Sequence, residues 1–137
     1  MSLRIILKPG EQLYIGSAQV SVDSQSQTRL LIEGELPVVR ERDYLPAEKA
    51  TSTARQLYLV LQRAYLQDDF DSYRDEYFRL VGMHLSAQPT ASPYIMEVNS
   101  MLGEKRLYAA LRASRKVVQF DEGLLTSSEE SARWEGF

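Results

Sequence analysis

The sequence predicts an α+β protein in which a small five-stranded antiparallel β module precedes a bundle of about four helices. Apolar and polar residues alternate through the first 46 residues, and turn residues recur there at short intervals. From residue 47 onward the apolar residues repeat every three or four positions, which is typical of amphipathic helices. Strands followed by helices favour the α+β class over an alternating parallel sheet.

The β module is predicted to span residues 1–46. Its strands are expected at residues 3–7, 13–15, 18–22, 28–32 and 36–42. Pro9 and Gly10 predict the first turn, because proline presets one dihedral angle and glycine admits a positive one. A module of this size is too small to be stable alone, so its sheet must be covered by the helices, by a second copy of the chain, or by both.

The first two helices are predicted from their apolar stripes and from polar residues suited to capping. Thr51 or Ser52 can cap a helix that runs to about Leu66. Asp71 can cap a second helix, which ends before the segment 88–93 with its two prolines.

Two further helices complete the predicted helical domain, which spans residues 47–125. Pro93 suits the first position of the third helix, and Gly103 is placed to end it. A fourth helix is expected over about residues 104–125. The remaining tail, residues 126–137, is predicted to be disordered, although it contains Trp134 and Phe137.

Composition excludes several classes of protein. The chain has no cysteine, which excludes a disulfide framework and a thiolate metal site and agrees with a reducing compartment, so we predict a cytoplasmic protein. No apolar stretch approaches the roughly 20 residues that a membrane span needs, and the N-terminus does not resemble a secretory signal. The net charge of −3 provides no global attraction to nucleic acid, so any such binding requires a local basic patch.

No residue pattern predicts catalysis. The single histidine, His84, lies near the end of the second helix without an identifiable nucleophile or orienting acid, and a structural role is expected for it. Neighbouring carboxylates such as Asp68 and Asp69 are interpreted as caps and solvated charge rather than as metal ligands. Since no glycine-rich phosphate loop is present either, we predict no catalytic residues, no metal, no cofactor and no enzyme.

Several segments, in their order and spacing, resemble the FlbT family of flagellar-biosynthesis repressors. They include residues 3–11 (LRIILKPGE), 30–33 (LLIE), 37–41 (PVVRE), 53–58 (TARQLY) and 108–111 (YAAL), and the resemblance covers about residues 3–125. It implies post-transcriptional control of flagellin through the untranslated leader of its mRNA. Members of the family act as repressors or as activators.

The β module alone is also similar to the CsrA family of RNA-binding proteins, through Gly10-Glu11, Ile15-Gly16 and the segment 39–44. This resemblance implies an intertwined homodimer that binds mRNA leaders with basic residues of the first strand and an arginine ending the fifth, which Arg40 matches. The chain departs from that family where consecutive arginines are replaced by Leu7 and Lys8.

Two hypotheses for function follow from these patterns. In the first, the β module binds RNA through its basic residues, which are Arg4, Lys8, Arg29, Arg40 and Arg42. A secondary basic stripe in the fourth helix is either a solvated face or a further phosphate contact, and its members are Lys105, Arg112, Arg115 and Lys116. In the second hypothesis, the tyrosine-rich helices bind flagellin or another flagellar regulator, and RNA is contacted only indirectly.

Overall fold

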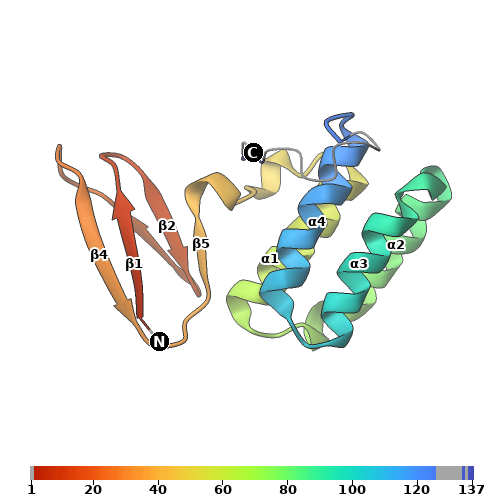
Figure 1. Cartoon of the computed structure of the whole chain (residues 1–137), viewed down its shortest axis with the longest axis horizontal. Coiled ribbons are helices and arrows are strands. Elements are labelled where there is room, and N and C mark those ends of the chain that lie inside the picture. The colour runs from red at the N-terminus through yellow and green to blue at the C-terminus, as the bar shows by residue number, and fades with distance from the viewer. Residues whose placement is uncertain (1, 126–133, 135) are drawn as a thin grey trace. The chain divides into compact units, whose positions relative to one another are not determined.

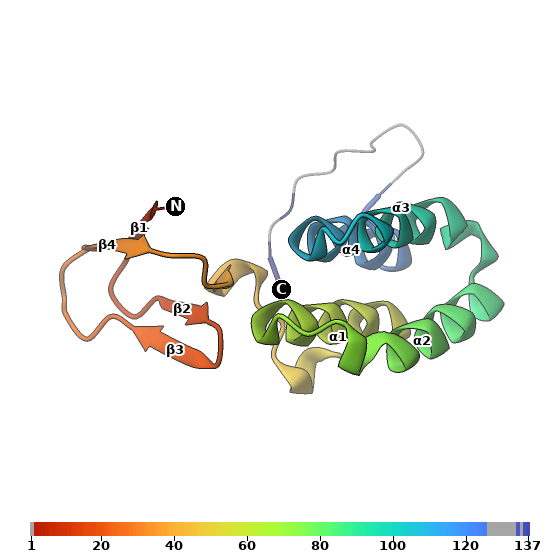
Figure 2. The same ribbon diagram turned by 90° about the horizontal axis from the view of Figure 1, so that it is seen from below.

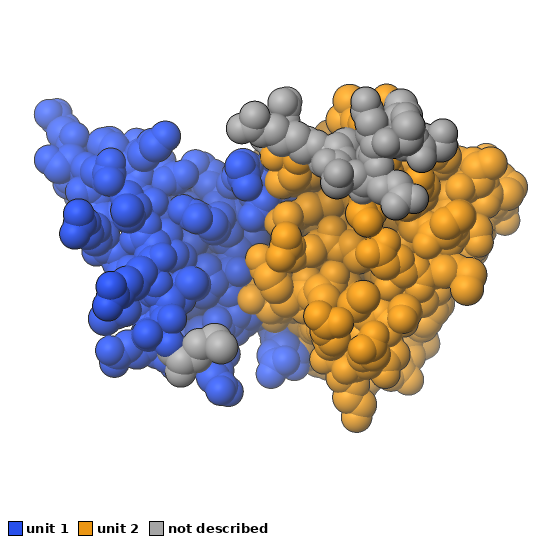
Figure 3. All heavy atoms as spheres, in the orientation of Figure 1, with its two compact units in different colours: residues 1–44, 66–68, 136–137 blue, residues 45–65, 69–135 orange. Residues whose placement is uncertain are grey.

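The computed structural model describes residues 2–125, 134 and 136–137. It contains five antiparallel strands followed by four α-helices, so the predicted α+β class is confirmed (Figure 1). The chain divides into two compact units (Figure 3). Residues 1–44, 66–68 and 136–137 form the first, and residues 45–65 and 69–135 form the second. The predicted tail 126–137 falls largely outside the described residues.

The first unit contains two small antiparallel sheets. Strand β1 (Ser2–Leu7) pairs with β4 (Thr28–Glu33) in a two-stranded sheet. Strand β2 (Gln12–Ile15) lies between β3 (Ala18–Ser21) and β5 (Val38–Arg40) in a three-stranded sheet. The registers are fixed by pairs such as Ile6 opposite Arg29 and Leu13 opposite Arg40.

Both sheets contribute side chains to one hydrophobic cluster. Ile5 and Leu7 of β1 and Leu13 of β2 are almost completely buried at its centre. Partly buried aliphatic residues of the other strands pack around them, and these are Val20, Leu30, Ile32 and Val38, together with Ile15 and Val22. Because side chains alternate along a strand, burial of Ile5 and Leu7 directs Arg4 and Ile6 to the opposite face of β1.

The turn between β1 and β2 forms as predicted. The backbone N–H of Glu11 donates to the Lys8 carbonyl at 3.0 Å, and the Lys8 N–H donates to Glu11 Oε1 at 3.0 Å. Gly10 has φ of +79°, a left-handed conformation that glycine adopts without steric cost. The turn therefore holds Lys8 at the end of β1.

The fifth strand is shorter than predicted. Only Val38–Arg40 pair as β5, and the next residues, Glu41–Asp43, form a 3₁₀ turn. Tyr44 follows this turn and stacks on Tyr14 of β2, with ring centroids 3.6 Å apart. The prediction that Arg42 lies on a strand is therefore wrong, because the chain leaves the sheet after Arg40.

The second unit is built from four helices, whose bounds are α1 (Thr53–Gln67), α2 (Arg74–Ala87), α3 (Ser92–Gly103) and α4 (Leu107–Asp121). Helices α3 and α4 lie side by side along their length (Figures 1 and 2). The apolar stripes of the four helices supply the buried side chains of this unit. The most deeply buried include Leu57, Tyr58, Leu61, Leu80, Ile95, Val98 and Leu111. No helix within the described residues is long and apolar enough to cross a membrane.

Ser52, one of the two predicted capping residues, caps α1, because its Oγ accepts the Arg55 N–H at 3.1 Å. The predicted cap of the second helix is wrong. Asp71 lies in a 3₁₀ turn and pairs with Arg74 at 3.0 Å, whereas Asp69 accepts the Ser72 N–H at the start of that turn. The intervening 3₁₀ turn shifts the start of α2 to Arg74.

The fourth helix is shorter than predicted at both ends. Lys105 has φ of +58°, which separates α3 from α4 and places Lys105 and Arg106 in the connection between them. At the other end Gly123 has φ of +74°, and the Gly123 and Leu124 N–H groups bond back to the last turn of α4. The helix therefore ends at Asp121.

Two polar contacts join α1 to other segments of the second unit. Gln62 is 1% exposed, and its side chain accepts the Leu45 N–H at 2.8 Å and donates to the Leu45 carbonyl at 3.0 Å. Near the start of the helix, Arg55 forms two hydrogen bonds with Glu122, at 2.7 and 3.2 Å. The hydrogen bond that Arg55 donates to the Glu122 carboxylate raises the pKa of the Arg55 guanidinium above its ordinary value.

Candidate nucleic-acid interface

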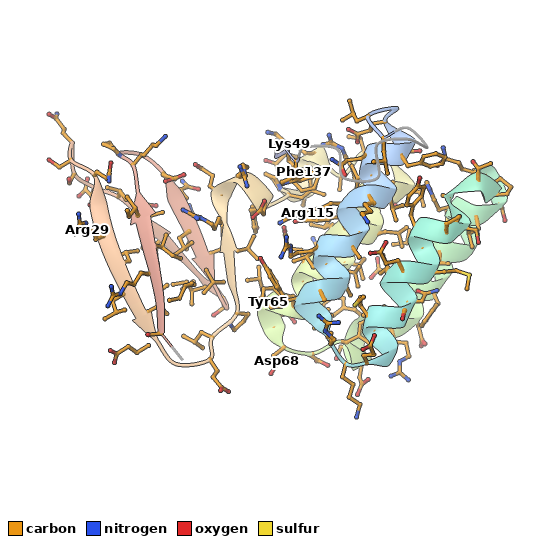
Figure 4. The ribbon with its side chains drawn as sticks, in the orientation of Figure 1. Arg29, Lys49, Tyr65, Asp68, Arg115 and Phe137 are labelled. Atoms are coloured by element: carbon orange, nitrogen blue, oxygen red, sulfur yellow. The ribbon has the colours of Figure 1, made fainter. Side chains whose placement is uncertain are left out.

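The outer face of the two-stranded sheet carries arginine and aliphatic side chains in alternation. Arg4 lies opposite Leu31, and Arg29 lies opposite Ile6, so the two arginines are diagonal neighbours. Residues opposite one another in an antiparallel pair share a face, and diagonal neighbours lie about 7–8 Å apart. Ile6 and Leu31 are 48% and 55% exposed, which leaves apolar surface between the two guanidinium groups. Figure 4 shows Arg29 projecting from β4.

Arg40 reaches the same part of the β module from the other sheet. Its Nη2 lies 3.5 Å from the backbone carbonyl of Ile6 in β1. Ile6 is directly opposite Arg29 and is two residues from Arg4. Arg40 is paired with Leu13, whose side chain is buried in the hydrophobic cluster, so Arg40 approaches the β1 backbone from the inner side. Two of the five predicted RNA-binding residues, Arg4 and Arg29, therefore share the outer face. We call Arg4, Arg29, Ile6 and Leu31 the arginine face.

The other two predicted residues lie away from this centre. Lys8 lies in the turn that follows β1, beyond the last paired residue. Arg42 lies in the 3₁₀ turn after β5, where its Nε is 3.9 Å from the carboxylate of Asp43. The backbone carbonyl of Arg42 accepts the Phe137 N–H at 3.3 Å, so this residue also takes part in a main-chain contact.

The secondary basic stripe is divided by the loop that precedes α4. Arg112, Arg115 and Lys116 lie on α4 and line one hollow of the second unit, together with Arg106. Lys105 is not among the lining residues, because it lies in the connection before the helix. Sequence reasoning missed the opposite wall, Glu97 and Met101 of α3, because the packing of α3 on α4 is not visible in residue spacing.

Trp134 was also not predicted to belong to this hollow. Its ring lies 5.2 Å from the Arg115 guanidinium and 6.4 Å from the Tyr58 ring. The only signal in the sequence was a large apolar residue in an otherwise polar segment, which gives no indication of where the ring packs.

His84 is 3% exposed and lies on the buried face of α2, and its structural role stays a prediction. Within the described part of the chain, no group of three or more histidine, cysteine, aspartate or glutamate residues is arranged to hold a metal ion. The groups gathered at the arginine face are hydrogen-bond donors and aliphatic side chains, which suit the binding of an anionic strand by contact.

Comparison with known protein families gives one match over most of the chain. The model of the family described as flagellar protein FlbT matches residues 3–125. This range includes the β module and all four helices.

Individual relatives agree with the family match. A probable flagellum biosynthesis repressor protein FlbT of Rhodopseudomonas palustris is 35% identical over 126 residues, which is 92% of this chain and 99% of the relative. One from Bradyrhizobium diazoefficiens is 35% identical over 90% of this chain and 85% of its own. The flagellum biosynthesis repressor protein FlbT of Caulobacter vibrioides is 23% identical over 89% and 88%, respectively. No solved structure matches the chain significantly.

Proposed function

Because the chain belongs to the flagellar protein FlbT family, we propose that it regulates flagellin synthesis after transcription by binding the untranslated leader of flagellin mRNA through the arginine face. The observation that carries this proposal is the placement of Arg4 and Arg29 as diagonal neighbours on one exposed face, with Arg40 bonded to the backbone of the same sheet. The protein acts in the cytoplasm by contact, without catalysis and without a cofactor.

The chemistry of the arginine face suits single-stranded RNA. Guanidinium groups bond to phosphate oxygens and base edges in two-pronged geometry, which an ammonium group cannot reproduce. The exposed side chains of Ile6 and Leu31 offer apolar surface to unstacked bases. Of the outward residues on the two strands, only Glu33 is acidic, and it lies opposite Ser2 at the far end of the pair.

The test replaces Arg4 and Arg29 with glutamine and measures binding of a fluorescent flagellin leader RNA. The matched control, Arg63→Gln with Arg79→Gln, removes the same charge from exposed positions of α1 and α2. Losing direct contacts should weaken binding by about 1–3 kcal/mol for each arginine, and the control should change little. Equal losses in both double variants would show that only net charge matters and would refute the assignment of the face.

We also propose a second candidate function, the binding of flagellin or another flagellar regulator by the helical unit. It is favoured by the large apolar side chains that remain exposed there, namely Phe78 and Met83 on α2 and Met96 on α3. Methionine adapts readily to a partner surface. Flagellin should bind the wild-type chain, and Phe78→Ser with Met83→Ser should abolish that binding without changing the affinity for leader RNA. Retained flagellin binding would exclude this surface.

A further inference from the structure

The hollow between α3 and α4 carries a strong local positive charge. Its described lining contains Arg106, Arg112, Arg115 and Lys116, with Glu97 as the single carboxylate among these residues, so the described lining has a charge of +3. Glu97 is already paired, because its Oε2 lies 3.4 Å from Lys116 Nζ. An anion that enters the hollow would therefore face arginines and would meet no unpaired carboxylate among the lining residues.

The hollow is large enough to hold a small anionic ligand. Its volume is about 360 Å³, which falls within the roughly 300–1,000 Å³ typical of small-ligand sites. Ala109 and Ala113, one helical turn apart on α4, line it with small side chains. Met101 lies on the α3 side and accepts a contact from Arg106 Nη1 at 3.4 Å. Small and apolar lining residues leave room for a flat ring beside the charged wall.

An aromatic residue completes the wall. Trp134 lines the hollow, with the Arg115 guanidinium 5.2 Å from its ring centroid. Figure 4 shows Arg115 projecting from α4. A basic surface combined with an aromatic ring is the combination by which proteins hold single nucleotides of a strand, the cations binding the phosphate and the ring contacting the base.

We infer that the α3–α4 hollow is a second ligand site, which binds one nucleotide unit with its phosphate against Arg112, Arg115 and Lys116. The inference rests on the proposed function for the identity of RNA as the strand, and a free nucleotide would supply the same chemistry. Three of the four cations are arginines, which favours phosphate over the carboxylates of an acidic peptide, since the guanidinium fork can contact two phosphate oxygens at once.

The chain contains a built-in reporter of this site, because Trp134 is its only tryptophan. When Trp134 is excited selectively, its fluorescence should change in a saturable manner as uridine monophosphate or a short oligouridylate is added. Saturation by the monophosphate would identify a free-nucleotide site, and a response to the oligonucleotide alone would identify a strand site. A glutamate-rich peptide should produce no such change.

The matched variants are Arg112→Gln with Lys116→Gln, which changes the hollow, and Arg63→Gln with Arg79→Gln, which removes the same charge elsewhere. The first pair should weaken the binding reported by Trp134 by about tenfold or more, and the second pair by less than about twofold. Equal effects of the two pairs would overturn the inference. The same conclusion would follow from no response to either nucleotide probe, or from tighter binding of the peptide.

A variant of the arginine face separates this inference from the proposed function. Arg4→Gln with Arg29→Gln should leave the Trp134 response to uridine monophosphate unchanged, because both residues lie in the other unit. Leader binding that depends on the arginine face, together with no Trp134 response to either nucleotide probe, would contradict only the inference. A hollow that binds nucleotides in a chain that does not bind the leader would contradict only the proposed function.

Discussion

Arg40 has a contact within the fold, yet its guanidinium group remains exposed. The bond to the Ile6 carbonyl is 3.5 Å long, at the limit of hydrogen bonding, and is solvent-exposed, so it contributes little to stability. We expect Arg40→Ala to lower the affinity for flagellin leader RNA by roughly 1–3 kcal/mol while the melting temperature barely changes. Parallel RNA titration and thermal unfolding measure both quantities. Unchanged affinity would refute the RNA role, and joint loss of affinity and stability would make Arg40 structural.

Gln62 is a buried polar side chain whose two hydrogen bonds go to the backbone of Leu45. Gln62→Leu would remove both bonds to Leu45 and leave a buried N–H and a buried carbonyl without partners. Each unsatisfied group costs roughly 1–3 kcal/mol, so urea unfolding should report a clear loss of stability. Gln67→Leu, at an exposed position of the same helix, is the matched control. Equal stability of the two variants would show that the contact contributes nothing.

At the scale of elements, the strands and helices could be predicted because their signals are local. The alternation of apolar and polar residues and the Lys8–Glu11 turn predicted β1 and β2. Ser52 predicted the start of α1, and Gly103 predicted the end of α3. The errors at Asp71 and Lys105 have a different origin. A 3₁₀ turn and a left-handed residue interrupt an apolar period that continues through them, so periodicity alone places these helix starts too early.

The sites were less predictable than the elements. The basic residues could be selected by type. The position of Arg29 beside Arg4, and the contact of Arg40 with the Ile6 carbonyl, depend on strand pairing between residues that are distant in the sequence. For the same reason the α3 wall of the hollow and the position of Trp134 could not be inferred.

The contact between α2 and α3 predicts a dependence of stability on pH. The Tyr77 hydroxyl donates to Asn99 Oδ1 at 2.7 Å, and burial raises the pKa of the Tyr77 phenol above its ordinary value. As pH rises, the unfolded chain therefore loses the Tyr77 hydroxyl proton before the folded chain does, at about pH 10. The stability contributed by neutral Tyr77 is fully present below that pH and is lost as pH rises toward the higher folded pKa, by up to about 1.4 kcal/mol per pH unit.

Tyr77→Phe tests this linkage. At neutral pH the variant should be less stable by about 1 kcal/mol, because the bond to Asn99 is lost. Between pH ~9 and ~11 it should lose less stability than the wild type, because phenylalanine cannot ionise. Urea unfolding across this range measures both effects, with Tyr73→Phe at a half-exposed position as the control. Parallel stability curves for wild type and Tyr77→Phe would contradict the account.

For the molecule as a whole, the sheets favour association of two chains. Among the described strands, β4 pairs only with β1 and β3 only with β2, so each has one edge that no other described strand pairs with. Such edges promote pairing with another chain, and the small β module would gain buried surface from it. We therefore predict a homodimer through the β module. Light scattering at micromolar concentration should give about twice the chain mass of 15.7 kDa, and a monomer throughout that range would exclude it.

The central claim is that this chain binds the flagellin mRNA leader directly. The most direct measurement is equilibrium binding of the purified wild-type chain to the leader and to a shuffled RNA of equal length, over a series of salt concentrations. The account predicts saturable binding that weakens with salt, because phosphate contacts release counterions, and a preference for the leader that persists at each salt concentration. Equal affinity for both RNAs, or no binding to either at micromolar protein, would contradict it.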